Sequence, residues 1–453
     1  MSDFKGKKIT VMGLGLYEHG SGIEAAKFFI SRGAEVIITD LRSASVLRPQ
    51  ITRINDFVKK YLPKGATKPI FHLGEHHEAD FKARDYVVKN PGVKSNSPFL
   101  ALAAQNGAEI ITDIILFFNL CQAKIVGVTG TRGKSTTSSL IAAILKYGGK
   151  KVWFGGNNTI SPLTFLEKVK KDDCVVLELS SWALEGLEKI KMSPRIAVVT
   201  NIYPDHLNTY NSLHDYIVAK KNIFKYQDKS GVLILNKHDI ETKKMASEAR
   251  GKVIWFDKIK IAGSKLSGEH NEANIAAATT VAKLFHIPNT KIVQVVKKFK
   301  GLAGRLELVR SSGGIKWYND TTATSPDGTR AALKTFYDKK KKIILIAGGV
   351  DKNLSYAGFG REIETQTKLV ILLPGTATEK IKAAVRGFEE PSGSRREMPH
   401  FIEVKNMAHA VRAAKLTAVK GDIVLLSPGA ASFGLFQNEF DRGEQFVKLV
   451  RKI

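Results

Sequence analysis

The sequence predicts an α/β protein with three domains and mostly parallel sheets. Its 453 residues exceed what one hydrophobic core usually holds, which is about 250–300 residues. Short apolar runs that end in glycine-rich or acidic turns alternate with stretches of helical periodicity along the whole chain. We predict a Rossmann-like domain over residues 1–112, a central P-loop ATPase-like domain over 113–302, and a C-terminal Rossmann-like domain over 303–453.

The first domain opens with an apolar run that enters a glycine turn at Gly13 and Gly15. Helical spacing follows, and a second apolar run ends at Asp40, so the segment has the pattern of a βαβ unit. The dinucleotide fingerprint is incomplete. A nucleotide diphosphate could lie at the helix N-terminus, with Asp40 or Arg42 near the ribose or base, or the glycines could form a tight turn without a ligand.

The second domain begins with the pattern of a phosphate-binding loop. The apolar run Ile125 to Val128 ends in a glycine-rich turn, and helical spacing starts after Lys134, Ser135 and Thr136. In such loops backbone N–H groups and a lysine bind phosphate, while a hydroxyl ligates Mg²⁺. Val128 stands where the strict pattern has its first glycine, so the alternative is a turn that merely contains these residues.

Polar residues follow two further predicted strands of this domain. Glu178 ends the apolar run 174–177, where P-loop proteins place a Mg²⁺-binding acid. The run 196–202 predicts the next strand and leads to Asp205 and His206. Because ligands bind at the carboxyl ends of parallel strands, we expect these side chains at one site.

The third domain again shows buried-type strands that end in glycine or proline turns. They lie within residues 315–320, 342–352, 369–375 and 422–429, with helical stretches between them. This arrangement predicts a doubly wound sheet.

The composition limits the classes of partner. The net charge of +27 raises the alternative of nucleic-acid binding, but the lysines are scattered and no zinc-finger, RRM or basic-zipper pattern occurs. We therefore do not expect nucleic acid as the main partner. No apolar stretch reaches 18 residues and no signal peptide is recognisable, so we expect a cytoplasmic protein without membrane insertion. Cys121 and Cys174 lie beside apolar runs and are expected to be core residues.

Several motifs together resemble the Mur ligase family, over essentially the whole chain. They are Gly-Val-Thr-Gly-Thr-Arg-Gly-Lys-Ser-Thr at 127–136, Glu178-Leu-Ser-Ser, Asn201 with Asp205-His206-Leu, Ala219-Lys220, His270-Asn-x-x-Asn274, Gly304-Arg305 and Asn319-Asp320. Gly348-Gly-x-Asp-Lys352, Leu426-Ser-Pro-x-x-Ala-Ser432-Phe and the glycine-led first domain look most like the members that add D-glutamate.

The resemblance implies an ATP-dependent ligase that joins a carboxylate of a UDP-sugar-peptide precursor to an amino acid with two Mg²⁺ ions. We expect the protein to be a monomer. Lys134 would contact the β- and γ-phosphates. Ser135 or Thr136 would hold the first Mg²⁺ with Glu178, and His206 would hold the second. Lys220 would join it as a carbamate formed with CO₂. The alternative for Lys220 is an ordinary surface lysine, with Lys221 as its neighbour.

The same resemblance implies three further groups of binding residues. Those for ATP are Gly130, Thr131, Gly133, Lys134, Ser135, Thr136, Asn271, Asn274, Arg305 and Asp320. Those for the UDP-sugar-peptide are Leu16, Tyr17, Asp40, Arg42, Gly92 and Asn157, and those for the amino acid are Thr324, Lys352 and Ser432. The two asparagines on the helix at 271–285 have an alternative role as helix caps.

Three residues depart from the usual D-glutamate pattern and leave the identity of the amino acid open. Thr322 stands in place of a lysine, Ala183 in place of a glutamine, and Glu439 in place of a phenylalanine. The alternatives are a ligase for another amino acid, a folylpolyglutamate-synthase-like enzyme, and a nucleic-acid-stimulated P-loop ATPase. Because Lys134, Glu178, His206 and Lys220 are all present, we do not expect a silent homologue.

Overall fold

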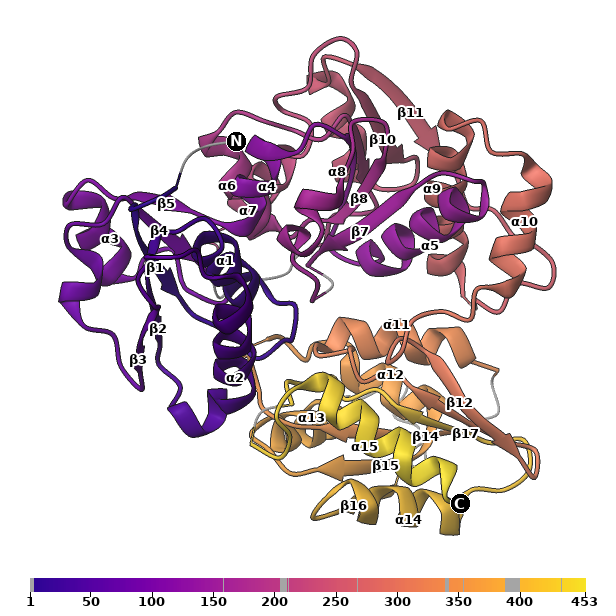
Figure 1. Cartoon of the computed structure of the whole chain (residues 1–453). Coiled ribbons are helices and arrows are strands. Elements are labelled where there is room, and N and C mark those ends of the chain that lie inside the picture. Colours follow the sequence, from indigo (N-terminus) through magenta and orange to yellow (C-terminus); the bar gives the residue numbers. More distant parts are fainter. Residues whose placement is uncertain are drawn as a thin grey trace. The chain divides into compact units, whose positions relative to one another are not determined.

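A computed structural model describes residues 4–157, 159–203, 210, 212–266, 268–338, 342–352, 354–387, 400–432 and 434–453. It contains three sheets flanked by helices (Figure 1), which confirms the predicted α/β class. The chain divides into two compact units. The first comprises Met1–Ala262 with His270–Val296, and the second comprises Gly263–Glu269 with Lys297–Ile453.

The first sheet has five parallel strands in the order β3-β2-β1-β4-β5. Its strands are β1 (Lys8–Met12), β2 (Glu35–Asp40), β3 (Ile70–Leu73), β4 (Tyr86–Lys89) and β5 (Glu109–Ile111). The helices of this part are α1 (Ser21–Ile30), α2 (Ala44–Tyr61) and α3 (Pro98–Gln105). Because β1 and β2 run parallel, the glycine turn after β1 and Asp40 at the end of β2 lie at the same edge.

The second sheet has six parallel strands in the order β11-β10-β9-β6-β8-β7. They are β6 (Lys124–Thr129), β7 (Val152–Gly156), β8 (Cys174–Glu178), β9 (Ile196–Val199), β10 (Val232–Asn236) and β11 (Lys252–Phe256). The helices are α5 (Lys134–Tyr147), α6 (Ser181–Lys189), α7 (Leu213–Lys221), α8 (Ile240–Met245), α9 (Glu269–Leu284) and α10 (Asn289–Lys298). The central strand β6 leads into the phosphate loop, with β8 and β9 on either side.

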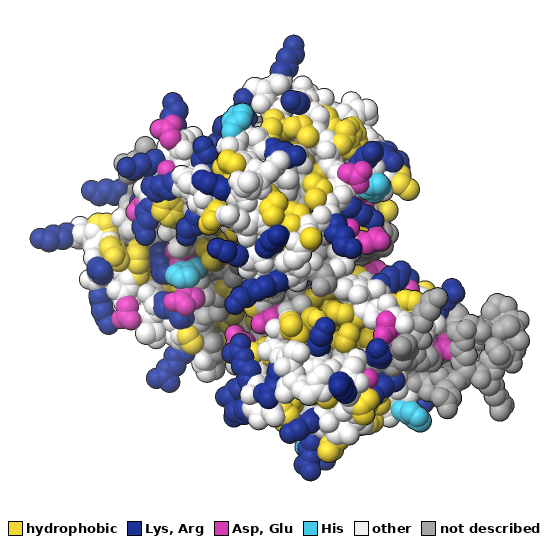
Figure 2. Space-filling view, turned by 90° about the vertical axis from the view of Figure 1, so that its right-hand side faces the viewer, with side chains coloured by type: hydrophobic (Ala, Val, Ile, Leu, Met, Phe, Trp, Pro, Cys, Tyr) yellow, Lys and Arg dark blue, Asp and Glu magenta, His cyan; other side chains and the backbone are white. Residues whose placement is uncertain are grey.

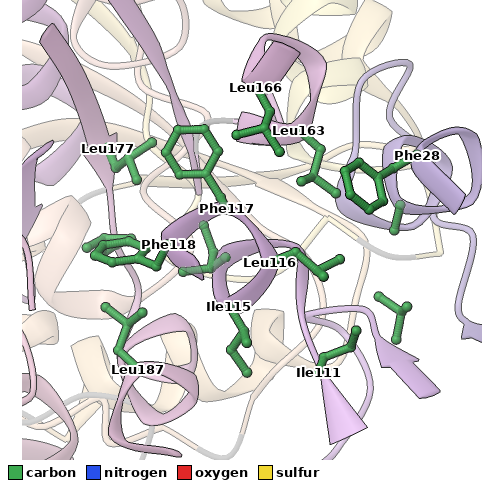
Figure 3. Close-up of a cluster of buried hydrophobic side chains, with 14 of the residues drawn as sticks. Phe28, Ile111, Ile115, Leu116, Phe117, Phe118, Leu163, Leu166, Leu177 and Leu187 are labelled. Carbon is green, nitrogen blue, oxygen red and sulfur yellow. The ribbon is translucent and has the colours of Figure 1, made fainter. Parts of the chain in front are cut away.

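One continuous apolar core joins the first two sheets. Helix α4 (Asp113–Leu120) begins where the Thr112 hydroxyl accepts a hydrogen bond from Ile115 N. Its side chains Ile115, Leu116, Phe117 and Phe118 pack against residues of both sheets' layers, including Phe28 of α1 (Figure 3). Cys174 on β8 is buried, as expected of a core residue, and this burial raises the pKa of its thiol to about 12.

The third sheet lies in the second unit, in the order β12-β13-β17-β14-β15-β16. Its strands are β12 (Glu307–Ser312), β13 (Ile315–Asn319), β14 (Ile343–Gly348), β15 (Thr367–Leu373), β16 (His400–Glu403) and β17 (Ile423–Leu426). Only β12 is antiparallel among these described strands. The helices are α11 (Pro326–Phe336), α12 (Phe359–Gln366), α13 (Ala377–Arg386), α14 (Met407–Thr417) and α15 (Glu439–Arg451). The boundaries of the three predicted domains stay predictions.

Positive side chains are scattered over the face of the molecule that Figure 2 draws. On the face drawn in Figure 2, Lys and Arg side chains are interspersed with apolar and acidic ones and do not form one patch. Within the described residues, no helix has the length and apolar character needed to span a bilayer.

Replacing Phe117 by alanine tests the shared core. The side chain is fully buried and its ring lies 5.7 Å from that of Phe165, so truncation leaves a cavity. We expect the free energy of unfolding to fall by about 3–5 kcal/mol, measured by urea denaturation. In the control Ile240→Ala the side chain is 70% exposed, and the change should stay within about 0.5 kcal/mol. Equal effects of the two substitutions would contradict this description of the core.

Candidate active site

The phosphate loop takes a backbone shape that requires two of its glycines. Gly130 has φ 143° and Gly133 has φ 83°, values that side-chain-bearing residues rarely adopt. A Cβ atom at Gly130 would overlap Thr200 Oγ1, and one at Gly133 would overlap Asn274 Oδ1. Lys134 Nζ folds back over the loop and donates to the carbonyl oxygens of Gly130, at 2.9 Å, and Thr131, at 3.1 Å.

The loop is fastened to the chain that follows β9. Arg132 N donates to Asn201 Oδ1 at 2.8 Å, and Asn201 Nδ2 donates to Arg132 O at 3.0 Å. Thr200 Oγ1 also donates to Arg132 O, at 2.6 Å. The strand therefore ends at Val199, three residues before the predicted end, because Thr200 and Asn201 pair with the loop.

Asn271 and Asn274 of α9 lie beside the loop. Thr137 Oγ1 of α5 donates to Asn274 Oδ1 at 3.2 Å, and Asn274 Nδ2 donates to Asn271 Oδ1 at 3.1 Å. Both asparagines are buried. The structure thus brings together these two residues and the phosphate loop, which are more than 130 positions apart in the sequence.

Glu178 ends β8 next to the loop and is 2% exposed. Its Oε1 accepts a hydrogen bond from Asn157 Nδ2 at 3.2 Å, and its backbone oxygen accepts one from Asn157 N at 2.9 Å. Its other carboxylate oxygen, Oε2, is buried without a hydrogen-bond donor among the described residues. A buried carboxylate oxygen in this state is suited to a cation.

Lys220 of α7 reaches the same edge and is 1% exposed. Its Nζ lies 3.1 Å from Gly130 O, 3.5 Å from Thr129 Oγ1 and 4.6 Å from the centre of the Tyr216 ring. Lys221, the alternative in the sequence, instead forms an ion pair with Glu248 on the surface. Of these two lysines, the structure thus places Lys220 beside the phosphate loop and Lys221 away from it.

The donor set at this edge fits Mg²⁺. Carboxylate and hydroxyl oxygens are its preferred protein ligands, and Glu178 supplies the first while Ser135 and Thr136 of α5 supply the second. No group of three His, Cys, Asp or Glu side chains suited to a metal occurs within the described part of the chain. The predicted ligand His206 lies outside the described residues.

At the edge of the first sheet, Asp40 holds the glycine turn. Its Oδ2 accepts hydrogen bonds from Leu14 N at 2.8 Å and Gly15 N at 3.3 Å, while its Oδ1 accepts one from Arg42 N at 2.9 Å. The carboxylate is 3% exposed, so these backbone contacts occupy it. The Arg42 side chain is about half exposed beside it and remains accessible to a ligand.

Other predicted nucleotide residues lie close to this turn. Gln50 Nε2 donates to Leu16 O at 2.6 Å, and Tyr17 is exposed. Gly92 is exposed and follows Asn90, whose side chain packs against the glycine turn. Ser161 N donates to His19 O at 2.7 Å, so the segment after Asn157 is joined to the predicted nucleotide loop.

In the second unit, three predicted residues lie on loops that the structure joins. Lys352 Nζ donates to Thr324 Oγ1 at 3.0 Å. Val350 and Ala431 form an antiparallel bridge with two 2.9 Å hydrogen bonds, which places Ser432 beside the loop that carries Lys352. Ser432 is buried, whereas Lys352 is exposed.

Two predicted ATP contacts lie next to strands of the third sheet: Arg305 precedes β12 and Asp320 follows β13. Asp320 Oδ1 accepts from Leu306 N at 3.1 Å and Oδ2 accepts from Ser427 Oγ at 2.8 Å, while Arg305 is exposed. Thr322, which replaces the usual lysine, donates its hydroxyl proton to Gly304 O at 3.0 Å.

Three residues of the phosphate-loop network received no role from the sequence, namely Thr200, Tyr216 and Asn201, of which Asn201 stands in one of the family motifs. The Tyr216 hydroxyl lies 3.3 Å from Thr131 Oγ1. Asn201 could have been found by the same rule that found Glu178, since it follows a parallel strand at its carboxyl end. Tyr216 sits in mid-helix and carries no such signal.

Comparison with known families agrees with this geometry. Models described as Mur ligase MurD-like N-terminal domain, Mur ligase middle domain, and Mur ligase glutamate ligase domain match residues 7–112, 128–262 and 304–429. A protein of Roseiflexus sp. named UDP-N-acetylmuramoylalanine–D-glutamate ligase is 39% identical, over 98% of both chains. The chain belongs to the Mur ligase family. A relative of the same name from Acetivibrio thermocellus is 35% identical, over 100% of this chain and 99% of its own.

Membership of the Mur ligase family makes this chain an ATP-dependent ligase of peptidoglycan precursor synthesis, as predicted. Solved structures share its fold. A UDP-N-acetylmuramate-alanine ligase from Thermotoga maritima has a TM-score of 0.61 at 17% identity, over 98% of this chain and 99% of that one. A Mycobacterium tuberculosis folylpolyglutamate synthase has a TM-score of 0.55 at 15% identity and covers 74% of this chain and 94% of its own.

Gly130→Ala should disable the phosphate loop of this Mur ligase. The new Cβ would strain a residue at φ 143° and collide with Thr200 Oγ1. We expect binding of a non-hydrolysable Mg-ATP analogue to weaken by about tenfold or more, measured by calorimetry. The control is Gly149→Ala, where φ is 92° but no atom lies within 4 Å, and its affinity should match the wild type. Unchanged affinity in folded Gly130→Ala would contradict the assignment.

Proposed function

We propose that this Mur ligase joins D-glutamate to UDP-N-acetylmuramoyl-L-alanine. The main support is that full-length relatives at 34–39% identity carry the name of that activity. The observation that carries the chemistry is the convergence of Lys134, Glu178 and Lys220 on one edge of the second sheet.

The proposed chemistry activates a carboxylate that is otherwise a poor electrophile. The γ-phosphoryl group of ATP passes to an oxygen of the L-alanyl carboxylate, which yields ADP and an acyl phosphate. The neutral amine of D-glutamate attacks the acyl carbon, a C–N bond forms, the amine loses a proton, and inorganic phosphate leaves. Negative charge develops at both steps, so cations and N–H groups stabilise the transition states.

Residues of the phosphate loop would bind the nucleotide phosphates. In this proposal Lys134 exchanges its contacts with the loop carbonyls for the β- and γ-phosphate oxygens. Glu178 would hold a first Mg²⁺ together with Ser135 or Thr136, and His206 with Lys220 would hold a second. The chemistry that such ions supply is neutralisation of phosphate charge. The orphaned Glu178 Oε2 supports the first of these sites.

Lys220 is proposed to act as a carbamate. The ammonium group would first lose one proton to solvent; a C–N bond would then form between the neutral Nζ and CO₂ with loss of a second proton, which gives an anionic oxygen ligand. The support is the position of Lys220, which is 1% exposed and has its Nζ 3.1 Å from Gly130 O of the phosphate loop.

The remaining residues are proposed as binding contacts. The ATP contacts are Gly130, Thr131, Gly133, Asn271, Asn274, Arg305 and Asp320. The UDP-sugar-peptide contacts are Leu16, Tyr17, Asp40, Arg42, Gly92 and Asn157, and the amino-acid contacts are Thr324, Lys352 and Ser432. Because one chain supplies all three sets of contacts, we propose that the protein acts as a monomer, which light scattering would check. We also propose that it acts in the cytoplasm, which cell fractionation would check.

A ligase for a different amino acid is the second candidate. It is favoured by Thr322, Ala183 and Glu439, which depart from the pattern of D-glutamate-adding members. The Thr322 hydroxyl is bonded to Gly304 O and supplies no charge in place of the lysine.

An ADP-release assay separates these candidates. With ATP, Mg²⁺ and UDP-N-acetylmuramoyl-L-alanine, we expect turnover with D-glutamate and none above background with L-glutamate, L-lysine, diaminopimelate or glycine. Turnover with another amino acid alone would show that the D-glutamate assignment is wrong while the ligase class is right. Reactions without the UDP-sugar-peptide serve as the control for ATP hydrolysis.

Lys220→Ala should abolish ligation, since a metal ligand would be lost. We expect acetate or formate at high concentration to restore part of the rate, because a small carboxylate can replace the carbamate oxygens. Lys221→Ala is the matched control, as its side chain pairs with Glu248 on the surface, and it should keep near wild-type activity. Full activity of Lys220→Ala would refute the carbamate.

A further inference from the structure

Arg442 is the largest fully buried side chain of the described residues, and the chemistry proposed above gives it no role. It lies in the first turn of α15, which begins after the cap residue Asn438. Burial lowers the pKa of its guanidinium to about 10, so the group remains charged at pH 7. A buried charge costs stability unless it is well hydrogen-bonded, so the contacts of Arg442 indicate its purpose.

The guanidinium bridges two loops at the edge of the third sheet. Nε donates to Thr321 Oγ1 at 3.1 Å and Nη2 donates to Thr321 O at 2.8 Å. Nη1 donates to Ala430 O at 3.2 Å. Thr321 follows β13 and Ala430 follows β17, so one rigid planar group holds the ends of two adjacent strands.

These two loops are also joined through the loop after β14. Ala431 pairs with Val350 by two backbone hydrogen bonds, and Lys352 Nζ donates to Thr324 Oγ1 at 3.0 Å. Gly429 N donates to Ala323 O at 2.9 Å. The loops after β13, β14 and β17 are therefore each joined to the other two. Arg442, on α15, contacts two of them at once.

The approach of α15 to Thr321 is close as well. A Cβ at Gly443 would lie 2.6 Å from Thr321 Cγ2, and Thr321 Oγ1 donates to Glu439 O at 2.7 Å. Phe446 and Val450 already anchor the helix in the apolar core, so an apolar residue at position 442 would suffice for packing alone.

We propose that Arg442 is a positioning residue that sets the spacing of the loops carrying Thr324, Lys352 and Ser432, and so determines the affinity for the incoming amino acid. The proposal rests on the function proposed above, which assigns those three residues to the amino acid. Arg442 itself does not touch the substrate in this account. It acts through Thr321 and Ala430.

The test compares Arg442→Lys, which keeps the positive charge but loses the planar set of N–H donors, with Arg442→Met, which loses both. We expect each to raise KM for the amino acid by about tenfold, the effect of losing a charged hydrogen bond, while KM for ATP and for the UDP-sugar-peptide stays within about twofold. Arg451→Lys, an exposed position on the same helix, is the control and should leave all three unchanged. Thermal unfolding reports whether each variant is folded.

Thr321→Val keeps the test decisive if the Arg442 variants do not fold. It removes the hydroxyl that accepts from Nε and should raise KM for the amino acid by about threefold, and less than additively when combined with Arg442→Met. An unchanged amino-acid KM in folded variants, or an equal rise for all three substrates, would overturn the positioning role alone. Absence of ligation by the wild type with every amino acid would instead overturn the proposed function, and the role with it.

Discussion

The hydrogen bonds between Arg132 of the phosphate loop and the residues after β9 are the contacts on which the rest of the site depends. They hold a glycine-shaped loop against a neighbouring strand, so Lys134, Glu178 and Lys220 meet at one edge although they come from three elements. If the loop moved, the lysines would lose their shared contact with Gly130 O. A parallel sheet makes this possible because all its strands end on the same side.

In the other two sheets a side chain also holds a loop at the ends of the strands, but by a different group. At the first sheet the carboxylate of Asp40 accepts hydrogen bonds from the backbone of the glycine turn. At the third sheet the guanidinium of Arg442 donates hydrogen bonds to a hydroxyl and two carbonyl oxygens. In each case a buried charged or polar side chain fixes a loop, and more exposed residues nearby, such as Arg42 and Lys352, remain accessible to ligands.

The residues proposed for the ATP chemistry and those proposed for the amino acid lie on different sheets. Departures from the family's pattern on one sheet therefore need not abolish the chemistry on the other. The groups proposed to activate the carboxylate belong to the second sheet, whereas two of the three departures, Thr322 and Glu439, lie beside Thr321 in the third. A change there alters the loops that would receive the amino acid. It leaves the phosphate loop and Glu178 as they are.

The sequence by itself determined the α/β class, the phosphate loop and the position of Glu178, because strand periodicity and glycine turns are local signals. It also determined the family, through motifs read in order. Only the tertiary structure decided that Lys220 points to the loop while Lys221 pairs with Glu248, and that Asn201, Tyr216 and Arg442 hold the loops. Neighbouring lysines have the same local pattern. Which of them is buried depends on contacts between residues about 90 positions apart.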